Sequence, residues 1–277
     1  MLVAILVNAG CTSAADAFSS DVHDGATPLG VMSFLDAGSG AATDCDRGTF
    51  GVASDASVTP LHGSATVELD VSSANEIIRL ETTLGVPGEP SPRGTSFVWP
   101  GLQPLGAGPP IGDGVLQTVL TWGATCAPEA PLDPYASWWV SPEYVNPGLD
   151  AGPLAGCRGG GGQSVGAGEA LHVVLERGGT TWSERVTDQQ SGRSSIFAVD
   201  LGGQPQRRAL FAIEQRDGAT PLVASFGETR ITFLGPEPVA CQPAARGERD
   251  VFSVPRSSRD GRTCCIDRIE LTAAGAL

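Results

Sequence analysis

The sequence predicts an all-β protein built as a sandwich or a barrel. Short segments with strand character follow one another along the chain, turn residues separate them, and no long stretch has helical periodicity. Glycine (37 residues) and proline (21 residues) are abundant among the 277 residues. This length is sufficient for one large β-domain or two small ones with a sizeable core.

The candidate strands are runs rich in β-branched and apolar residues, with turn signals between them. They are Ala65–Val71, Glu76–Thr83, Ser96–Leu102, Gly114–Trp122, Ala136–Val140, Glu169–Glu176, Thr181–Thr187, Arg193–Asp200, Arg207–Gln215 and Glu228–Leu234. The tail adds two further candidates, Asp250–Val254 and Cys265–Leu271. So many strands without a helix indicate two packed sheets or a closed barrel.

The charge balance excludes one class of partner. The formal net charge is −14, and the acidic residues are scattered along the chain. Nucleic-acid binding needs a basic surface, so we expect no nucleic-acid partner. An acidic composition also suits a protein that works in acid, where protonated carboxyls repel each other less, although solubility alone would explain it equally well.

The N-terminus resembles a bacterial lipoprotein signal. An apolar run, Leu2–Val7, precedes Asn8-Ala9-Gly10-Cys11. Small residues directly before a cysteine are typical of such signals, in which the cysteine is lipidated. We therefore expect export and a possible membrane anchor through a lipid on Cys11.

The cysteine count also favours export. Lipidation of Cys11 would leave six of the seven cysteines, enough for three disulfides in an oxidising compartment. Their pairing is open, but adjacent cysteines at 264 and 265 should bond to different partners. No CxxC pair occurs and the three histidines are far apart, so we expect no metal site and no cofactor. The disulfide candidates are Cys45, Cys126, Cys157, Cys241, Cys264 and Cys265.

Two polar residues interrupt apolar faces of candidate strands. Because side chains alternate along a strand, Gln117 shares a face with Val115 and Val119, and Glu214 shares one with Leu210 and Ala212. A buried amide or carboxyl without a partner costs about 1–3 kcal/mol. The two groups could satisfy one another through water if their strands lie side by side.

Residues 80–235 resemble the glutamic peptidases (eqolisins), which are secreted acid endopeptidases. The resemblance rests on the order and spacing of eight blocks, each weak by itself. They are LETTLGVP (Leu80–Pro87), FVWPGLQ (Phe97–Gln103), VLQTVLTW (Val115–Trp122), YASWWVSPEYV (Tyr135–Val145), VGAGEALHVVLE (Val165–Glu176), SERVTDQQSGRS (Ser183–Ser194), ALFAIEQ (Ala209–Gln215) and PLVASFGETRITF (Pro221–Phe233). The resemblance implies an antiparallel two-sheet β-sandwich of the concanavalin-like jelly-roll type.

The resemblance also implies a catalytic pair, Gln117 and Glu214, acting on a polypeptide substrate. The glutamate would take a proton from water and return it to the leaving amine, while the amide would orient the water and stabilise the oxyanion. A glutamate with an ordinary pKa of about 4.3 suits a medium near that pH. Substrate contacts are expected from the cleft tryptophans Trp99, Trp138 and Trp139.

Some positions depart from the family pattern. Leu210 replaces the first glutamate of the block that ends in Glu214, and Trp139-Val140 stand where the family has an acidic substrate contact. Adjacent residues of a strand point to opposite faces, so we expect one of Trp138 and Trp139 in the core and leave a groove position open for the other.

Other interpretations remain open. The chain could be a non-catalytic surface module that binds glycans or peptides, or a structural envelope lipoprotein. Gly162–Gly166 matches the GxSxG pattern of serine hydrolases, but that pattern needs a strand before it and a helix after it. We expect four parts along the chain: a signal-like segment (1–11), a tether and irregular region (12–60), the sandwich domain (61–236) and a disulfide-linked extension (237–277).

Overall fold

The protein is described here by a computed structural model. The structure describes residues 45, 52–53, 64–90, 94–105, 114–146, 154–237, 241–245 and 250–275. The predicted lipidation site Cys11 and the signal-like segment lie outside these residues. The described part contains strands and turns and no α-helix, which confirms the all-β prediction.

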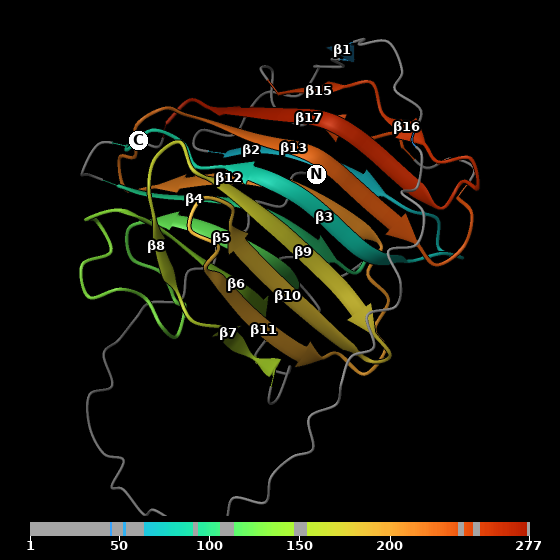
Figure 1. Ribbon diagram of the computed structural model, residues 1–277, viewed down its shortest axis with the longest axis horizontal. Helices are drawn as coiled ribbons and strands as arrows, with labels where there is room; N and C mark the ends of the chain where they lie inside the picture. Colours follow the sequence, from blue (N-terminus) through green and yellow to red (C-terminus); the bar gives the residue numbers. More distant parts are fainter. Residues whose placement is uncertain are drawn as a thin grey trace, which may run out of the picture.

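The strands form two antiparallel sheets that pack face to face, as the resemblance implied. Sheet A has the order β1-β15-β17-β13-β3-β9-β10-β11, with β16 paired to β17, and its strands follow one another across Figure 1 from β15 to β11. Its members are β1 (Val52–Ala53), β3 (Ile77–Gly85), β9 (Ala170–Gly178), β10 (Thr181–Asp188), β11 (Ser194–Asp200), β13 (Leu222–Phe233), β15 (Val251–Ser253), β16 (Arg256–Ser257) and β17 (Thr263–Ala273).

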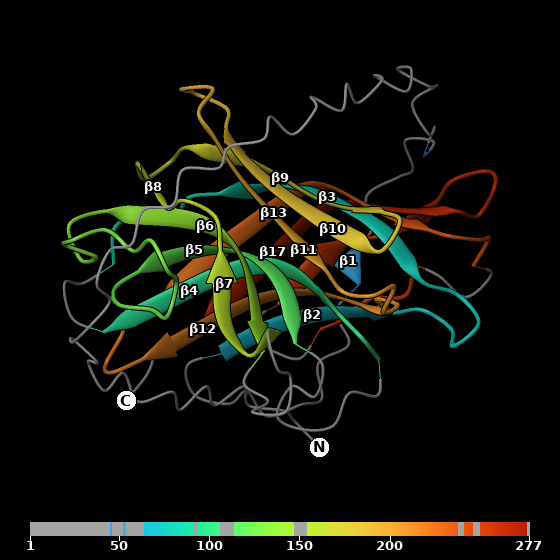
Figure 2. The same ribbon diagram turned by 90° about the horizontal axis from the view of Figure 1, so that it is seen from below.

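Sheet B has the order β14-β2-β12-β4-β5-β6-β7, with β8 paired to β6. Figure 2 shows it as a second layer, with β12 and β4 on one side and β3 and β9 of sheet A on the other. Its members are β2 (Ser64–Asp70), β4 (Thr95–Gln103), β5 (Val115–Trp122), β6 (Trp138–Asn146), β7 (Gly156–Gly159), β8 (Gln163–Val165), β12 (Arg208–Arg216) and β14 (Ala244–Ala245).

The main core fills the space between the two sheets. Alternate residues of each strand point inward, as in Val67 and Leu69 of β2 or Leu80 and Leu84 of β3, and these side chains are at most 1% exposed. Aromatic edge-to-face pairs join Phe211 to Phe226 and Trp122 to Trp138, at centroid distances of 5.1 and 5.8 Å. Full burial of each large apolar side chain contributes about 1.5–3 kcal/mol.

A second apolar cluster lies on the outer face of sheet B, the face that points away from sheet A. It consists of Phe97, Trp99, Val115, Val119, Leu210 and Ala212. Each of these residues alternates along its strand with residues of the main core, and each is at most 9% exposed. Sheet B is therefore apolar on both faces at its centre. This outer-face cluster surrounds the candidate site.

The C-terminal region belongs to the sandwich. The sequence suggested an extension from residue 237 onward, but β17 pairs with β13 over ten residue positions and also with β15 and β16. Its residues Ile266, Ile269 and Leu271 are part of the main core. Removal of this region would therefore expose one hydrogen-bonding edge of β13.

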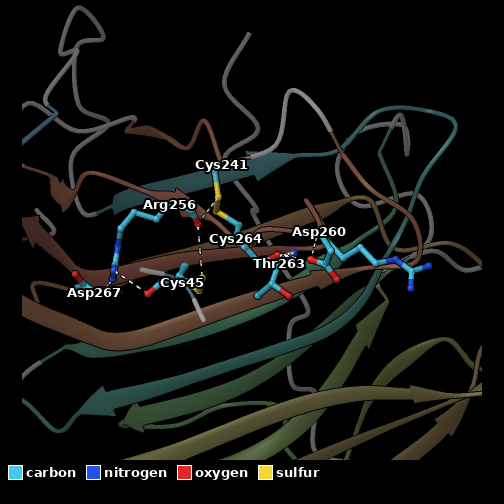
Figure 3. The surroundings of a disulfide bond; sticks show 10 residues. Cys45, Cys241, Arg256, Asp260, Thr263, Cys264 and Asp267 are labelled. Atoms are coloured by element: carbon cyan, nitrogen blue, oxygen red, sulfur yellow. Dashed lines mark hydrogen bonds and ion pairs between the residues drawn. A yellow bond between two sulfur atoms is a disulfide. The ribbon is translucent and has the colours of Figure 1, made fainter. Parts of the chain in front are cut away.

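All six predicted cysteines form disulfides: Cys45–Cys265, Cys126–Cys157 and Cys241–Cys264. The adjacent cysteines 264 and 265 bond to different partners, as expected. Figure 3 shows how Arg256 connects this region: its guanidinium contacts the Asp267 carboxylate and donates to the Cys45 carbonyl at 3.2 Å. Three disulfides are typical of a protein that folds in an oxidising compartment.

No helix within the described ranges is long and apolar enough to cross a membrane.

Candidate functional site

Gln117 lies at the centre of sheet B and points to the outer face. Val115 and Val119, on either side of it along β5, belong to the outer-face cluster. Gln117 is half-buried, and its side-chain amide makes no hydrogen bond to any described residue. A half-buried amide among apolar neighbours, with its donor and acceptor unused, is available to a ligand or a water molecule.

The residues beside Gln117 form a row across sheet B, because antiparallel partners point to the same face. On one side Gln117 pairs with Gly101 of β4, which pairs with Leu210 of β12. On the other side it pairs with Glu143 of β6. Gln117 therefore has no side chain beside it on β4 and a carboxyl beside it on β6.

Glu143 is an ionisable group that the sequence analysis did not select. Its side chain is buried, with 1% of the residue exposed, and this burial raises its pKa to about 7. The Ser141 hydroxyl donates a hydrogen bond to Oε1 and opposes that rise. No described residue donates a hydrogen bond to Oε2. The predicted strand ended at Val140, whereas β6 continues to Asn146, so that Trp139, Ser141 and Glu143 alternate along one strand.

Glu214 also points to the outer face of sheet B, on β12. The Trp99 indole lies beside its carboxyl, and the Arg216 guanidinium lies 3.8 Å from that carboxyl and over the Phe97 ring. Burial raises the pKa of Glu214 to about 7, while Arg216 and Trp99 lower it. Because 22% of the side chain is exposed, water moderates this rise.

The structure places Gln117 and Glu214 on the same face of the same sheet but does not bring them together. β4 lies between their strands, so Gln117 and Glu214 are not on neighbouring strands, as the sequence-based hypothesis of a shared water molecule required. Glu214 pairs with Phe97 and Gln117 pairs with Gly101, four residues further along β4. At about 3.3 Å per residue and roughly 4.8 Å between strands, this offset is about 13 Å along the sheet and roughly 10 Å across it.

Trp99 occupies the position between the two groups. It lies on β4 midway between Phe97 and Gly101, and it is 3% exposed. Its indole lies beside the Glu214 carboxyl, while ring atoms Cε3 and Cζ3 lie 3.1 Å from the position that a Cβ on Gly101 would take. The indole thus fills the space in which Gln117 and Glu214 would have to share a water molecule.

The two other predicted cleft residues point to opposite faces of β6, as expected. Trp138 lies in the main core, where its indole donates to the Gly88 carbonyl at 3.3 Å, so it is not available to a substrate in this structure. Trp139 points to the outer face, is fully buried, and lies next to Gly162. Its Nε1 has no hydrogen-bond partner within the described part of the chain.

A second buried carboxyl lies between the sheets. Glu184 of β10 is fully buried, and neither of its oxygens has a hydrogen-bond partner among the described residues. Burial raises its pKa well above the usual range, and the Glu143 charge raises it further. Glu184 alternates with Trp182 and Val186, so the period-two pattern could have identified it as a core position.

Other features of the sequence are not part of this site. Ser164 of the GxSxG pattern lies in the short strand β8 and leads into β9, without the helix that a nucleophile elbow requires. Among the residues with described positions, no three potential metal ligands cluster together.

Comparisons with known proteins concern the fold. No family model matches the chain, and no curated protein matches it in sequence. Among solved structures, scytalido-glutamic peptidase with a peptide-based transition-state analogue has a TM-score of 0.48 and 13% identity, over 74% of this chain and 98% of that one. The eqolisin SCP-B with a tripeptide has a TM-score of 0.44 and 11% identity, over 78% and 98%.

Sugar-binding proteins are also similar. Lectin II from Ulex europaeus has a TM-score of 0.32 and 10% identity, over 79% of this chain and 86% of the lectin. The carbohydrate-binding module CBM66 from Bacillus subtilis has a TM-score of 0.29 and 8% identity, over 62% and 89%. All four TM-scores lie below 0.5, and no conclusion about this chain is drawn from them.

Proposed function

We propose that this chain hydrolyses peptide bonds with a water molecule that is bound and oriented by Gln117 on the outer face of sheet B. The observation that carries the proposal is the unused amide of Gln117, half-buried in an apolar surface beside a carboxyl. Such an amide can donate to an oxyanion through its NH₂ group and accept from water through its carbonyl.

The chemistry requires one carboxyl as well as the amide. A carboxylate takes a proton from the water as the water oxygen attacks the peptide carbonyl, and it later returns this proton to the leaving nitrogen. The sequence-based candidate is Glu214, and Glu143 is the second carboxyl on this face. No metal or covalent intermediate is needed for this reaction.

The raised pKa values change the expected pH range. The expectation of a reaction near pH 4 assumed an ordinary glutamate pKa, whereas burial raises the pKa of both candidates to about 7. A general base works where its carboxylate form is populated. Activity should therefore increase from pH 5 toward pH 8 instead of reaching its maximum near pH 4.

The proposal is tested by incubating the purified chain with denatured casein and a mixed peptide library at pH 3 to 8. Mass spectrometry would identify new termini. Gln117→Ala should abolish cleavage, while Gln103→Ala, at the end of β4 in the same sheet, should retain it. If the folded wild-type chain cleaves neither substrate at any pH, the proposal is wrong.

A second candidate function is a non-catalytic module that binds peptides or glycans. The position of Trp99 favours it, because this indole separates Gln117 from Glu214 and leaves the predicted pair without a shared water site. A module of this kind would retain ligands in a peptide or glycan array without changing them. Binding that is lost in Gln117→Ala, with no cleavage at any pH, would favour this function.

We further propose that the protein acts outside the cytoplasm and is anchored by a lipid on Cys11. The three disulfides support an oxidising compartment. Labelling with a radioactive fatty acid in cells that express the wild-type chain or Cys11→Ala tests the anchor. Equal incorporation in the two proteins would exclude a lipid at this cysteine.

A further inference from the structure

We infer that Glu143, and not Glu214, is the carboxyl that transfers protons in partnership with Gln117. This inference rests on the proposed peptide hydrolysis and assigns one of its two groups. Three observations support it: the position of Glu143 beside Gln117, the atoms of these two side chains that make no hydrogen bond, and the contacts that Glu214 makes elsewhere.

Position is the first argument. Gln117 and Glu143 are direct partners on the neighbouring strands β5 and β6 and point to the same face. The Cβ atoms of such partners lie about 4.5–5.5 Å apart, so the ends of both side chains can reach one water molecule. No hydrogen bond joins the two side chains directly, which leaves the amide and the carboxyl free to bind that water.

The second argument is the hydrogen bonding of Glu143. Ser141, two residues earlier on the same face of β6, donates to Oε1 and thereby fixes the orientation of the carboxyl. Oε2 receives no hydrogen bond from a described residue. One oxygen is thus held in place while the other is available, which is the arrangement that a positioned general base needs.

The third argument is that Glu214 already has partners. The Trp99 indole lies beside its carboxyl, Arg216 lies 3.8 Å away, and β4 separates its strand from that of Gln117. To act on a water held by Gln117, Glu214 would have to displace the Trp99 indole from a tightly packed position beside Gly101. The neighbours of Glu214 are therefore Trp99 and Arg216, and Gln117 is not among them.

The proton balance of the proposed step is complete. The Glu143 carboxylate takes one proton from water, the water oxygen bonds to the peptide carbon, and the carbonyl electron pair moves to an oxyanion that accepts a hydrogen bond from the Gln117 amide. When the carbon–nitrogen bond breaks, the protonated Glu143 gives its proton to the leaving amine. Water and an amide become a carboxylic acid and an amine, and Glu143 returns to its starting state.

Uncharged groups lie directly beside Glu143. β5 faces it with Gln117 and β7 with Gly159, and Pro128 of the preceding loop packs against Gly159. The same loop carries Glu129, whose carboxyl lies beside Gly161. From sheet A, Glu184 is the ionisable neighbour. Burial raises the pKa of Glu184 as well, and the hydrogen bond from Ser141 is the contact that favours the charged form of Glu143.

The experiment compares kcat/KM of the full chain and its variants between pH 4 and pH 8.5, with circular dichroism to confirm folding. Glu143→Gln should lose about 100-fold or more, the usual contribution of a general base. Glu214→Gln should retain activity within about threefold. Glu228→Gln, on the exposed bulge of β13 in sheet A, is the unrelated control.

Ser141→Ala provides a second test that leaves the carboxyl in place. Loss of the hydroxyl removes a hydrogen bond to the charged form of Glu143, so the ascending limb of the pH profile should move to higher pH. A purely structural role for Ser141 would change stability without moving that limb. An unmoved limb would overturn the inference even if Glu143→Gln failed to fold.

The outcomes separate this inference from the proposed function. If Glu214→Gln abolishes cleavage and Glu143→Gln does not, the assignment of Glu143 is wrong while peptide hydrolysis stands. If the wild-type chain does not cleave at any pH, the proposed function and this assignment are both wrong. Loss of cleavage in Glu143→Gln together with a shifted limb in Ser141→Ala supports both.

Discussion

The indole of Trp99 lies beside the carboxyl of Glu214 across the β4–β12 strand pair and lowers the pKa of that carboxyl. The same ring packs over Gly101, which is the β4 partner of Gln117. One side chain therefore determines both the environment of Glu214 and the space beside Gln117. The position of Glu214 at the end of an apolar stripe has a structural explanation that does not require catalysis.

Trp99→Phe should destabilise the protein more at pH 8 than at pH 5. Phenylalanine preserves most of the packing but lacks the indole N–H that favours the charged form of Glu214, and a buried carboxylate that loses a polar partner costs about 1–3 kcal/mol. At pH 5 this carboxyl is largely protonated in the folded state because burial raises its pKa. Urea unfolding at both pH values measures the difference.

Trp139→Phe is the matched control. Trp139 is fully buried on the same face of sheet B, but its Nε1 has no partner within the described residues. The loss of ring volume is the same, whereas no hydrogen bond is lost. Equal pH dependence in the two variants would show that the Trp99 indole does not stabilise the charged form of Glu214.

The sequence predicted which face of a strand each side chain occupies, but it did not predict which strands lie next to each other in the sheet. Alternation correctly placed Gln117 and Glu214 on apolar faces, since side-chain direction in a strand is a local property. Strand order depends on pairing between distant segments, and nothing in the two strands indicated that β4 would lie between them. Glu143 lies beyond the predicted strand Ala136–Val140, and its alternation with Trp139 and Ser141 depends on β6 continuing past Pro142 to Asn146.

The disulfides and the core also combine features that the sequence predicts with features that depend on the fold. Three bonds among six cysteines followed from their number, but their pairing required the fold, because Cys45 and Cys265 are 220 residues apart in sequence. Glu184 occupies a position that alternation assigns to the core, and the charge on its side chain argued against that assignment.

The free energy of unfolding should decrease as the pH rises from about 4.5 through 7. Burial raises the folded-state pKa of Glu143 and Glu214 to about 7 and that of Glu184 well above its usual range. Between the unfolded and folded pKa values the folded state binds more protons, so each rise in pH favours unfolding. Urea titrations at pH 4.5, 6, 7 and 8.5 measure this decrease.

Below pH 4.5 the dependence should reverse. His172 and Arg79 lower the pKa of Glu81 to about 2 through hydrogen bonds and charge. The stability that the lowered pKa of Glu81 contributes is present above the pKa of this residue in the unfolded state, and it is lost as the pH falls toward 2. Maximal stability is therefore expected near pH 4 to 5. A stability maximum at pH 7 or above would contradict the environments described for Glu143 and Glu184.

Glu184→Leu should stabilise the protein at pH 8.5 and change its stability little at pH 4.5. At high pH the wild-type chain must either bury a charge or hold a proton against the solvent, and neither Glu184 oxygen is hydrogen-bonded among the described residues. An apolar side chain of similar volume removes this cost, so a gain of about 1–3 kcal/mol is expected. Glu228→Leu, at an exposed position, should give no such pH-dependent gain.

Gly101→Ala should destabilise the protein and impair any activity that depends on Gln117. A Cβ at this position would lie 2.7 Å from the Leu116 carbonyl oxygen and 3.1 Å from the Trp99 ring. The backbone of β5 cannot yield easily, so a loss of about 1–3 kcal/mol is expected from overpacking. Gly178→Ala is the control, because a Cβ at this position, at the end of β9, would have no other atom of the described residues within 4 Å.

The disulfide between Cys126 and Cys157 should affect the candidate site more than the other short-range disulfide does. It joins the loop that contains Pro128 to β7, whose Gly159 lies beside Glu143. Its serine double variant should lose about 3–4 kcal/mol of unfolding free energy through loop entropy. The same variant should lower the pKa of Glu143 toward its ordinary value, because β7 and the Pro128 loop would pack less tightly over the carboxyl. A pH titration of stability measures both effects.

The serine double variant of Cys241 and Cys264 provides the comparison for that prediction. The two disulfides close similar lengths of chain, with sequence separations of 31 and 23, so their entropic contributions should be nearly equal. Cys264 lies in β17 of sheet A, away from Glu143. This variant should therefore lose stability by a similar amount at every pH and leave the decrease between pH 4.5 and 7 unchanged. If both variants flatten that decrease equally, the cover formed by β7 and the Pro128 loop does not control the ionisation of Glu143.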